Sequence, residues 1–450
     1  MKITLLIIYG IILLMLGLYS ALRIKSPVDY FLAGKRTGTV RISGSLLATI
    51  LGGSAILGTA NLAVRQGWAA AWYLLSASLG LWLLVPLAGK VSRLGRFTLT
   101  GMVGRFYGET ARQTASVIIP LAWTGVVAAQ MVAAARILYS LFALPYAGGV
   151  LIAGIVFIGY TLLGGQLSIL KTDFLQAFVI LAGLSLCAVL LGIRPDIQYS
   201  PLKASFPFNP SFSFPDLLIL VLTFSSTFVV GPDIYSRIFC AKNERTARNS
   251  VILVASILIP FAFLLTAMGI FARDNLPAGQ LQGSAALIEL IDCYLPEWAV
   301  GLMAAALLSA VLSSADTTLL NASMILSELV TPDIDNLKSL QTTRLFIVGT
   351  GLVSILVAMK ITSIIDMLLM AMAVYSGAFI VPLLAALIGI RVIPSMGMPA
   401  MIAGGSIALA GKILTGMYGF SWGNLLIIFA FFINFLLLTG GRTIRTKRTG

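Results

Sequence analysis

The sequence contains no histidine among its 450 residues. This absence excludes a Ser-His-Asp triad, metal sites built on histidine and a histidine proton relay. There is no evident nucleophile–base pair and no GxxxxGK[ST] loop, which argues against an enzyme and against ATP as the direct energy source. The three cysteines, Cys187, Cys240 and Cys293, form no CxxC pair, so we expect isolated buried or boundary thiols without a disulfide framework.

Charged residues are also scarce, at 10% of the chain, whereas 59% of the residues are hydrophobic and the mean hydropathy is +1.00. Soluble domains carry about 25% charged residues, because their surface needs polar coverage. A surface that faces lipid has no such need, so the composition predicts an integral membrane protein. The formal net charge of +14 does not indicate a nucleic-acid partner, because the basic residues cluster in short breaks between apolar runs.

Thirteen apolar runs are long enough to cross a hydrocarbon core of about 30 Å. They lie near residues 4–22, 38–64, 70–89, 114–142, 147–166, 172–193, 215–236, 250–272, 298–327, 342–360, 363–390, 398–414 and 421–440. The first run has only Lys2 ahead of it and no A-x-A site, so we interpret it as a span and not as a signal peptide. Two segments, 194–214 and 274–297, are expected to stay outside the membrane, the second with a short helix over 285–293.

The loop charges predict the orientation. With an external N-terminus, the cytoplasmic breaks hold 22 of the 30 basic residues. These residues are Arg23, Lys25, Lys35, Arg36, Arg41, Lys90, Arg93, Arg96, Arg105, Arg112, Lys171, Arg237, Lys242, Arg245, Arg248, Lys338, Arg344, Arg391, Arg442, Arg445, Lys447 and Arg448. Because cytoplasmic loops are enriched in lysine and arginine, we expect a multi-pass protein of the cell (inner) membrane with its C-terminus in the cytoplasm.

Two runs contain residues that disfavour a continuous helix. The second run carries Gly52, Gly53 and Ser54 near its middle, which indicates either close helix packing through small residues or a discontinuous helix facing a central site. The seventh run carries Gly231-Pro232, and proline interrupts helical hydrogen bonding. Phe224 and Phe228 lie one turn apart in this run, where they either contact a solute or pack against lipid and neighbouring helices.

The two interrupted runs are five apart, and a five-helix repeat has an odd number of crossings, so a second copy is inverted in the membrane. Interrupted helices at matching places in two inverted halves indicate a transporter site. The sequence therefore predicts an all-α transmembrane transporter.

Polar residues within apolar runs mark a cation site. Asp173 enters the sixth run at the membrane edge, where a solvated or helix-capping role is the alternative. The ninth run places Ser313, Ser314, Asp316, Thr317 and Thr318 within two helical turns. A lone buried carboxylate is costly unless it is paired, and hydroxyl oxygens suit a small hard cation, although serine and threonine also bond to their own helix backbone.

At these residues the sequence resembles the sodium:solute symporter family, in the segments GGQLSILKTDFLQ, DIYSRIFCAKNERTA and SAVLSSADTTLLNAS. The resemblance covers roughly residues 25–440. It implies a LeuT-type fold with a 5+5 inverted repeat over 37–193 and 215–390, one extra N-terminal helix and two extra C-terminal helices.

The resemblance also implies site residues. A sodium site would use the carbonyls of Ala48, Leu51 and Ala310 with the hydroxyls of Ser313 and Ser314. A possible second sodium site would use Asp173, Ser313, Asp316 and Thr317, which is a departure from the mostly hydroxyl shell of the family. The implied solute site falls on Gly52, Gly53, Ser54, Phe224, Thr227, Phe228 and Tyr375.

These observations predict a sodium-coupled symporter that imports a small solute by alternating access. The amides of Gly52 and Gly53 at a helix break favour an amino acid or a small organic anion over a sugar. The expected partners are the solute, Na⁺ and the lipid bilayer. Two alternatives stay open: a proton-coupled carrier on the same fold, with Asp173 or Asp316 carrying the proton, and a membrane module that senses solute without pumping it.

Overall fold

The computed structural model describes residues 2–24, 26–94, 98–194, 206–277, 286–331, 336–418 and 423–440. Within these ranges it is entirely helical, apart from two isolated bridges, Thr37 with Ala241 and Asn209 with Phe212. This confirms the all-α class. Part of the predicted external loop (195–205) and the basic tail (441–450) lie outside the described residues.

The long helices follow the predicted apolar runs. The elements are α1 (Lys2–Ala21), α2 (Pro27–Leu32), α3 (Thr39–Ile50), α4 (Gly53–Gln66), α5 (Trp72–Leu94), α6 (Leu99–Tyr107), α7 (Glu109–Phe142), α8 (Tyr146–Gly192), α9 (Phe214–Leu220), a π-helical turn (Val221–Ser225), α10 (Ser226–Val230), α11 (Pro232–Phe239), α12 (Glu244–Asn275), α13 (Ala286–Tyr294), α14 (Glu297–Val330), α15 (Leu337–Lys360), α16 (Ile364–Ile388), α17 (Gly397–Tyr418) and α18 (Leu425–Thr439).

Ten helical segments of the described chain are long and apolar enough to cross a membrane, against thirteen predicted runs. The difference comes from how the runs are joined. The segment Gly53–Leu94 contains half of the second run and all of the third, α8 contains the fifth and sixth, and α18 is short. A straight helix of the 47 residues of α8 would be about 70 Å long, more than twice the hydrocarbon core. The non-helical Gly165 (φ 52°, ψ −170°) interrupts it. The count of thirteen crossings stays a prediction.

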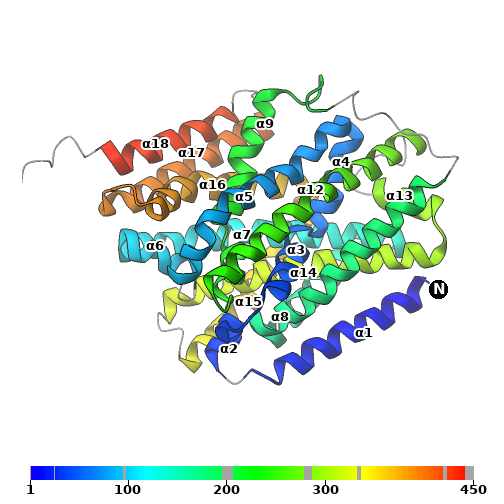
Figure 1. Cartoon of the computed structure of the whole chain (residues 1–450), viewed down its shortest axis with the longest axis horizontal. Helices are drawn as coiled ribbons and strands as arrows, with labels where there is room; N and C mark the ends of the chain where they lie inside the picture. Colours follow the sequence, from blue (N-terminus) through cyan, green and yellow to red (C-terminus); the bar gives the residue numbers. More distant parts are fainter. Residues whose placement is uncertain are drawn as a thin grey trace, which may run out of the picture.

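Helix α14 forms the centre of the bundle and α1 lies along one edge (Figure 1). In the most apolar window of α14, 78% of the residues are buried, against 17% in α1. Helix α14 packs against α7, α8, α15 and α3. Helix α1 is nevertheless part of the bundle, because the hydroxyls of Tyr9 and Ser309 lie 2.5 Å apart and join it to α14.

The outer helices expose large apolar side chains, as a lipid-facing surface requires. Examples are Ile8 and Met15 on α1, Leu345 and Leu356 on α15, and Phe432 on α18. The predicted short helix between the eighth and ninth runs is present as α13. Its Leu287, Ile288, Leu290 and Ile291 are buried, so one face of α13 packs on the bundle.

Candidate functional site

The second apolar run is a broken helix. Helix α3 ends at Ile50, Leu51 (φ −79°, ψ 43°) and Gly52 (φ −65°, ψ 165°) leave the helical conformation, and α4 begins at Gly53. The discontinuous-helix interpretation is therefore confirmed. Because backbone groups at a break lack helical partners, this is a place where carbonyl oxygens and amides become available to a ligand.

The same glycines also allow α14 to approach the break closely. A Cβ on Gly52 would lie 2.1 Å from Ser314 Oγ, and one on Gly53 would lie 2.0 Å from Val311 Cγ2. The packing interpretation is thus also correct. The Ser314 hydroxyl donates a hydrogen bond to the Thr49 carbonyl at 2.7 Å, which joins α14 to the last turn of α3.

The residues implied for the first sodium site come from α3, from the break and from α14, and α3 and α14 pack against each other. Ala48, Leu51 and Ala310 are fully buried, as is Ser313, and Ser314 is 3% exposed. The Ser313 hydroxyl donates to Asp173 Oδ1 at 2.6 Å. Since the proton of each serine points to another acceptor, the oxygen lone pairs remain able to coordinate a cation.

Asp173 lies inside the helical bundle. Its side chain is fully buried and forms an ion pair with Arg237, whose Nη2 lies 3.1 Å from Oδ2. Ser45 donates to the same carboxylate oxygen at 2.5 Å. Arg237 was predicted in a cytoplasmic loop, and that prediction is wrong, because its guanidinium is 0% exposed.

The residues of the possible second sodium site gather around this ion pair. Thr317 accepts a hydrogen bond from Arg237 Nη2, and its own hydroxyl lies 3.4 Å from Asp316 Oδ1. Asp316 is fully buried. Its Oδ2 has no hydrogen-bond partner within the described part of the chain.

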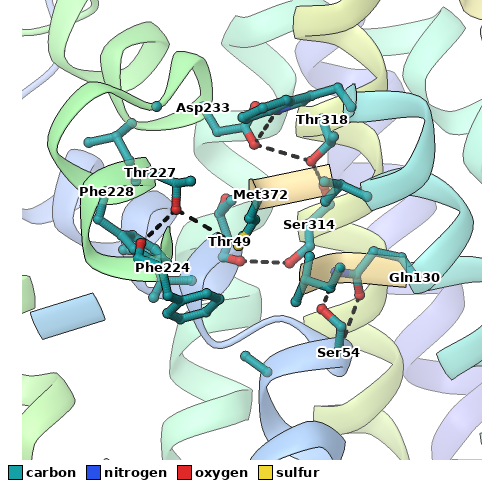
Figure 2. A pocket seen from close by; sticks show the side chains of 17 residues that line it. Thr49, Ser54, Gln130, Phe224, Thr227, Phe228, Asp233, Ser314, Thr318 and Met372 are labelled. Carbon is teal, nitrogen blue, oxygen red and sulfur yellow. Dashed lines mark hydrogen bonds between the residues drawn. The ribbon is translucent and has the colours of Figure 1, made fainter. Parts of the chain in front are cut away.

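A central pocket of about 70 Å³ lies beside the break (Figure 2). It is lined by Thr49, Ile50, Ser54, Ala55, Trp123, Val126, Gln130, Phe224, Thr227, Phe228, Gly231, Asp233, Ile234, Ser314, Thr318, Leu368 and Met372. Of the predicted solute-site residues, Ser54, Phe224, Thr227 and Phe228 are therefore on its wall, whereas Gly52, Gly53 and Tyr375 are not.

Tyr375 supports the pocket from behind. Its hydroxyl donates to the Val230 carbonyl at 2.5 Å, at the end of α10. Its ring packs edge-on against Trp123, with centroids 4.6 Å apart. Tyr375 thus fixes Trp123 and the second helix break, at Gly231 (φ −68°, ψ 135°), where the predicted interruption by Gly231-Pro232 is confirmed.

Polar groups line the two ends of the pocket (Figure 2). At one end, Asp233 accepts hydrogen bonds from Trp123 Nε1 at 2.8 Å, from Asn321 Nδ2 at 2.7 Å and from Thr318 at 3.3 Å. At the other end, the Gln130 amide exchanges bonds with Ser54: Nε2 donates to Ser54 Oγ at 2.7 Å, and Oε1 accepts from the Ser54 N–H at 3.2 Å.

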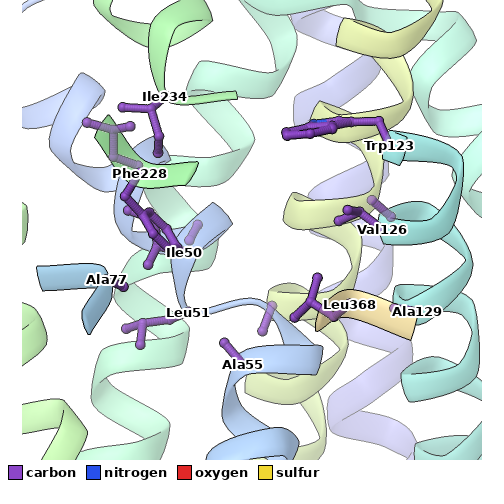
Figure 3. Packing of buried hydrophobic residues seen from close by; sticks show 14 of the residues in the cluster. Ile50, Leu51, Ala55, Ala77, Trp123, Val126, Ala129, Phe228, Ile234 and Leu368 are labelled. Atoms are coloured by element: carbon purple, nitrogen blue, oxygen red, sulfur yellow. The ribbon is translucent and has the colours of Figure 1, made fainter. Parts of the chain in front are cut away.

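Between these ends the walls are mainly apolar (Figure 3), apart from Thr49, Thr227 and Ser314. Ile50, Phe228 and Ile234 lie on one side of the pocket and Val126 and Leu368 on the other. A pocket with apolar walls and few, separated polar groups suits a small organic molecule.

A second cavity of about 190 Å³ lies next to the central pocket. Its lining includes Gln66, Tyr73, Asp216, Lys412 and Asn424. Lys412 Nζ donates to Asn424 Oδ1 at 3.1 Å.

Several residues of the pocket and of the buried ion pair escaped sequence reasoning. Asp233 directly follows the Gly231-Pro232 break, and a carboxylate beside an interrupted helix was the signal that could have found it. Trp123 and Gln130 stand alone in a long apolar helix and carry no local pattern. Arg237 adjoins a group of basic loop residues, so only the fold distinguishes it from them.

Comparison with known proteins identifies the family. The profile of the sodium:solute symporter family matches residues 30–194 and 201–404. The chain belongs to the sodium:solute symporter family. This membership makes it a multi-pass membrane symporter and not an enzyme, with Na⁺ as the co-transported ion.

Two similar proteins are also named as symporters. The sodium/pantothenate symporter of Escherichia coli (strain K12) is 25% identical over 404 residues, which cover 84% of this chain and 83% of that protein. The uncharacterized symporter YwcA of Bacillus subtilis (strain 168) is 23% identical over 270 residues, which cover 57% of this chain and only 53% of that protein.

Solved structures show the same fold. A Na⁺-coupled sialic acid symporter in a substrate-bound, outward-open state matches with a TM-score of 0.79 at 17% identity, over 100% of this chain and 98% of that chain. A nucleobase-cation-symport-1 family transporter in a closed conformation matches with a TM-score of 0.58 at 14% identity, over 93% of this chain and 94% of that chain. These likenesses confirm the LeuT-type fold.

Proposed function

We propose that this symporter imports a small solute that carries a positively charged amino group, such as an amino acid, by sodium-driven alternating access. Of the two predicted classes, amino acid and small organic anion, the central pocket favours the first. The proposal includes the predicted topology, with the N-terminus outside, the C-terminus in the cytoplasm and inverted repeats over 37–193 and 215–390.

Asp233 is the observation that carries the proposal. It lines the pocket, and its three hydrogen-bond donors, Trp123, Thr318 and Asn321, are all neutral. It forms no ion pair with any described residue, and no lysine or arginine of the described chain lines the pocket. Asp233 is half-buried, and an ionised carboxylate that loses hydration without a paired counter-charge is costly, so a solute ammonium would offset that cost.

The aromatic walls support the same class. Trp123, Phe224 and Phe228 all line the pocket. Aromatic faces attract a desolvated ammonium by about 2 kcal/mol. Met372 adds an adaptable apolar surface for the rest of the solute.

The helix break offers fewer available backbone amides to an anion than we expected from the sequence. Gly52 and Gly53 lie against α14 instead of lining the pocket. The Ser54 N–H, at the start of α4, already donates to Gln130 Oε1. A solute whose only charges are carboxylates would lie in the same pocket as Asp233 without an ammonium group to offset the repulsion.

The geometry of the break supports the location that we propose for the coupled sodium ion. In our proposal Na⁺ binds the carbonyls of Ala48, Leu51 and Ala310 and the hydroxyls of Ser313 and Ser314. Ser314 also lines the solute pocket, so a bound ion and a bound solute share one wall. Binding of either one must then favour the other by the same factor. Each positive charge carried inward across 100 mV adds about 2.3 kcal/mol of driving force.

A thermal-shift screen of the purified protein tests the solute class. The solutes are amino acids, their 2-hydroxy-acid analogues, which lack the ammonium group, dicarboxylates and sugars, each with sodium or with potassium as the cation. We expect stabilisation by an amino acid only when sodium is present, and none by the matching hydroxy acid. Stabilisation by a dicarboxylate instead would reject the proposed class.

Asp233→Asn should abolish the response to the amino acid and leave sodium stabilisation intact. Asp216→Asn is the matched control, because Asp216 lines the second cavity and not the central pocket. Uptake into proteoliposomes then completes the test. Uptake driven by a pH gradient without sodium would indicate a proton-coupled carrier, and binding without uptake would indicate a sensor.

A further inference from the structure

A buried cluster with the chemistry of a cation site lies behind the proposed sodium site. It contains the carboxylates of Asp173, from α8, and Asp316, from α14. Four hydroxyls surround them, from Ser45, Thr49, Ser313 and Thr317. Carboxylate and hydroxyl oxygens are the donors that hard cations prefer.

A guanidinium lies in this cluster. Arg237, from α11, donates through Nε to Ser45 Oγ at 3.0 Å and through Nη1 to Ser236 Oγ at 3.2 Å. Its Nη2 donates to Thr49 Oγ1 at 3.0 Å, to Asp173 Oδ2 at 3.1 Å and to Thr317 Oγ1. Apart from its neighbour Ser236, every acceptor of Arg237 is one of the cluster's oxygen donors. The positive charge inside this cluster is therefore supplied by a side chain of the protein.

We propose that Arg237 takes the place of a second sodium ion, so that this symporter binds a single Na⁺ in each transport cycle. The inference rests on the proposed function, because it assumes the sodium site at the α3–α4 break. It assigns to Asp173, Thr317 and Asp316 a role around the guanidinium instead of around an ion.

The net charge of the cluster favours the binding of one sodium ion over two. With both carboxylates ionised, two carboxylates and one guanidinium leave one negative charge, and Asp316 Oδ2 is the carboxylate oxygen without a partner in the described chain. Ser313 connects the two sites, because its hydroxyl donates to Asp173 while its oxygen faces the proposed sodium. A single Na⁺ at the break balances the remaining charge, whereas a second one would lie beside the guanidinium and be repelled.

Equilibrium binding of radioactive sodium to the purified wild-type protein is the first test, with Na⁺ alone as the probe. We expect one ion for each transporter and a binding curve without sigmoidal shape. Two ions in the wild type would overturn the inference and leave the proposed function standing. No sodium binding at all would instead reject the sodium site of the proposed function, and this inference with it.

Neutralising the guanidinium is the second test. Arg237→Gln should bind a second ion and give a sigmoidal curve, because it leaves two carboxylates without a counter-charge. The double variant Arg237→Gln/Asp173→Asn should return to one ion. An Arg237→Gln protein that still binds one ion would overturn the inference.

Two further variants keep the test decisive if Arg237→Gln does not fold. Arg237→Lys retains the charge and should bind one ion, and a second ion there would contradict the role of the charge. Arg112→Gln is the control, because Arg112 pairs with Glu109 and Glu328 away from the cluster. It should keep the wild-type stoichiometry. Together with the wild-type measurement, these proteins decide the inference by ion count alone.

Discussion

The ring of Tyr73 stacks on the ring of Phe224, with centroids 4.3 Å apart and planes inclined by 30°. Tyr73 lines the second cavity and Phe224 lines the central pocket, so the stacked pair forms part of the wall between the two spaces. Phe224 continues this wall to Phe228, whose ring lies edge-on at 5.1 Å. We therefore expect the pair to control passage between the second cavity and the solute pocket.

Tyr73→Ala should open the central pocket to the second cavity, because truncation removes one ring of the stack. The readout is the labelling rate of Thr227→Cys, which lines the central pocket, by a charged thiol reagent in a Cys293→Ser background. We expect the rate to rise by at least about tenfold, which corresponds to about 1.4 kcal/mol of lost closure. Tyr73→Phe is the control, since the Tyr73 hydroxyl has no partner among the described residues. Equal labelling in both variants would exclude a gating role.

Removal of either hydroxyl at the helix break should weaken sodium binding. Ser313→Ala and Ser314→Ala each delete one proposed ligand, and we expect the sodium dissociation constant to rise by about tenfold for each, or about 1.4 kcal/mol. The measurement is sodium-dependent thermal stabilisation. Ser323→Ala is the matched control, because this buried serine of α14 bonds only to the Leu319 carbonyl. Unchanged sodium affinity in both test variants would show that the site lies elsewhere.

Features that depend only on the chemistry of neighbouring residues in the chain could be predicted from the sequence. The breaks at Gly52 and Gly231 were identifiable because glycine and proline disfavour helix interiors wherever they occur. Ser313 and Ser314 were identifiable because hydroxyls are conspicuous in an apolar helix. The ion pair of Arg237 with Asp173 was not, because its partners are 64 positions apart and only the fold brings them together.

Residues that can serve equally well in a structural or a binding role could not be assigned from the sequence. Tyr375 was predicted to touch the solute, but an aromatic residue in a span serves equally well as a support, and its hydroxyl bonds to the backbone at Val230. Asp233 was overlooked because it follows a helix break near the end of an apolar run, where a solvated carboxylate is common. Its partial burial and its hydrogen bonds depend on Trp123 and Asn321, which come from two other helices.

Close packing between Gly53 and Val311 should be sensitive to a single methyl group. In Gly53→Ala the new Cβ would lie 2.0 Å from Val311 Cγ2, and overpacking of this kind costs about 1–3 kcal/mol. Thermal unfolding in detergent measures the loss. Val311→Ala removes the opposing atom, so the double variant Gly53→Ala/Val311→Ala should be more stable than Gly53→Ala alone. Gly349→Ala is the control, because nothing lies within 4 Å of a Cβ there. Additive losses in the double variant would contradict direct contact.

Glu328 joins the end of α14 to the start of α6. Its carboxylate accepts hydrogen bonds from Thr98 and, at 2.6 Å, from Thr100, and Arg112 Nη1 lies 3.6 Å away. Glu328→Gln retains the shape but replaces one acceptor oxygen by a donor, so a buried threonine hydroxyl loses its acceptor. We expect a loss of about 1–3 kcal/mol in the free energy of unfolding, seen as a lower midpoint of thermal unfolding.

Glu109→Gln is the matched control for this prediction, because Glu109 pairs with the same arginine at 2.6 Å but is 58% exposed. An exposed ion pair contributes only about 0–1 kcal/mol, so this variant should stay close to the wild type. A larger loss in Glu109→Gln than in Glu328→Gln would mean that the arginine, and not the two threonine hydroxyls, stabilises this end of α14. A loss in Thr98→Ala at least as large as in Glu328→Gln would support the assignment to the hydroxyls. Thr98→Ala should lose somewhat more, because Thr98 is also the N-cap of α6.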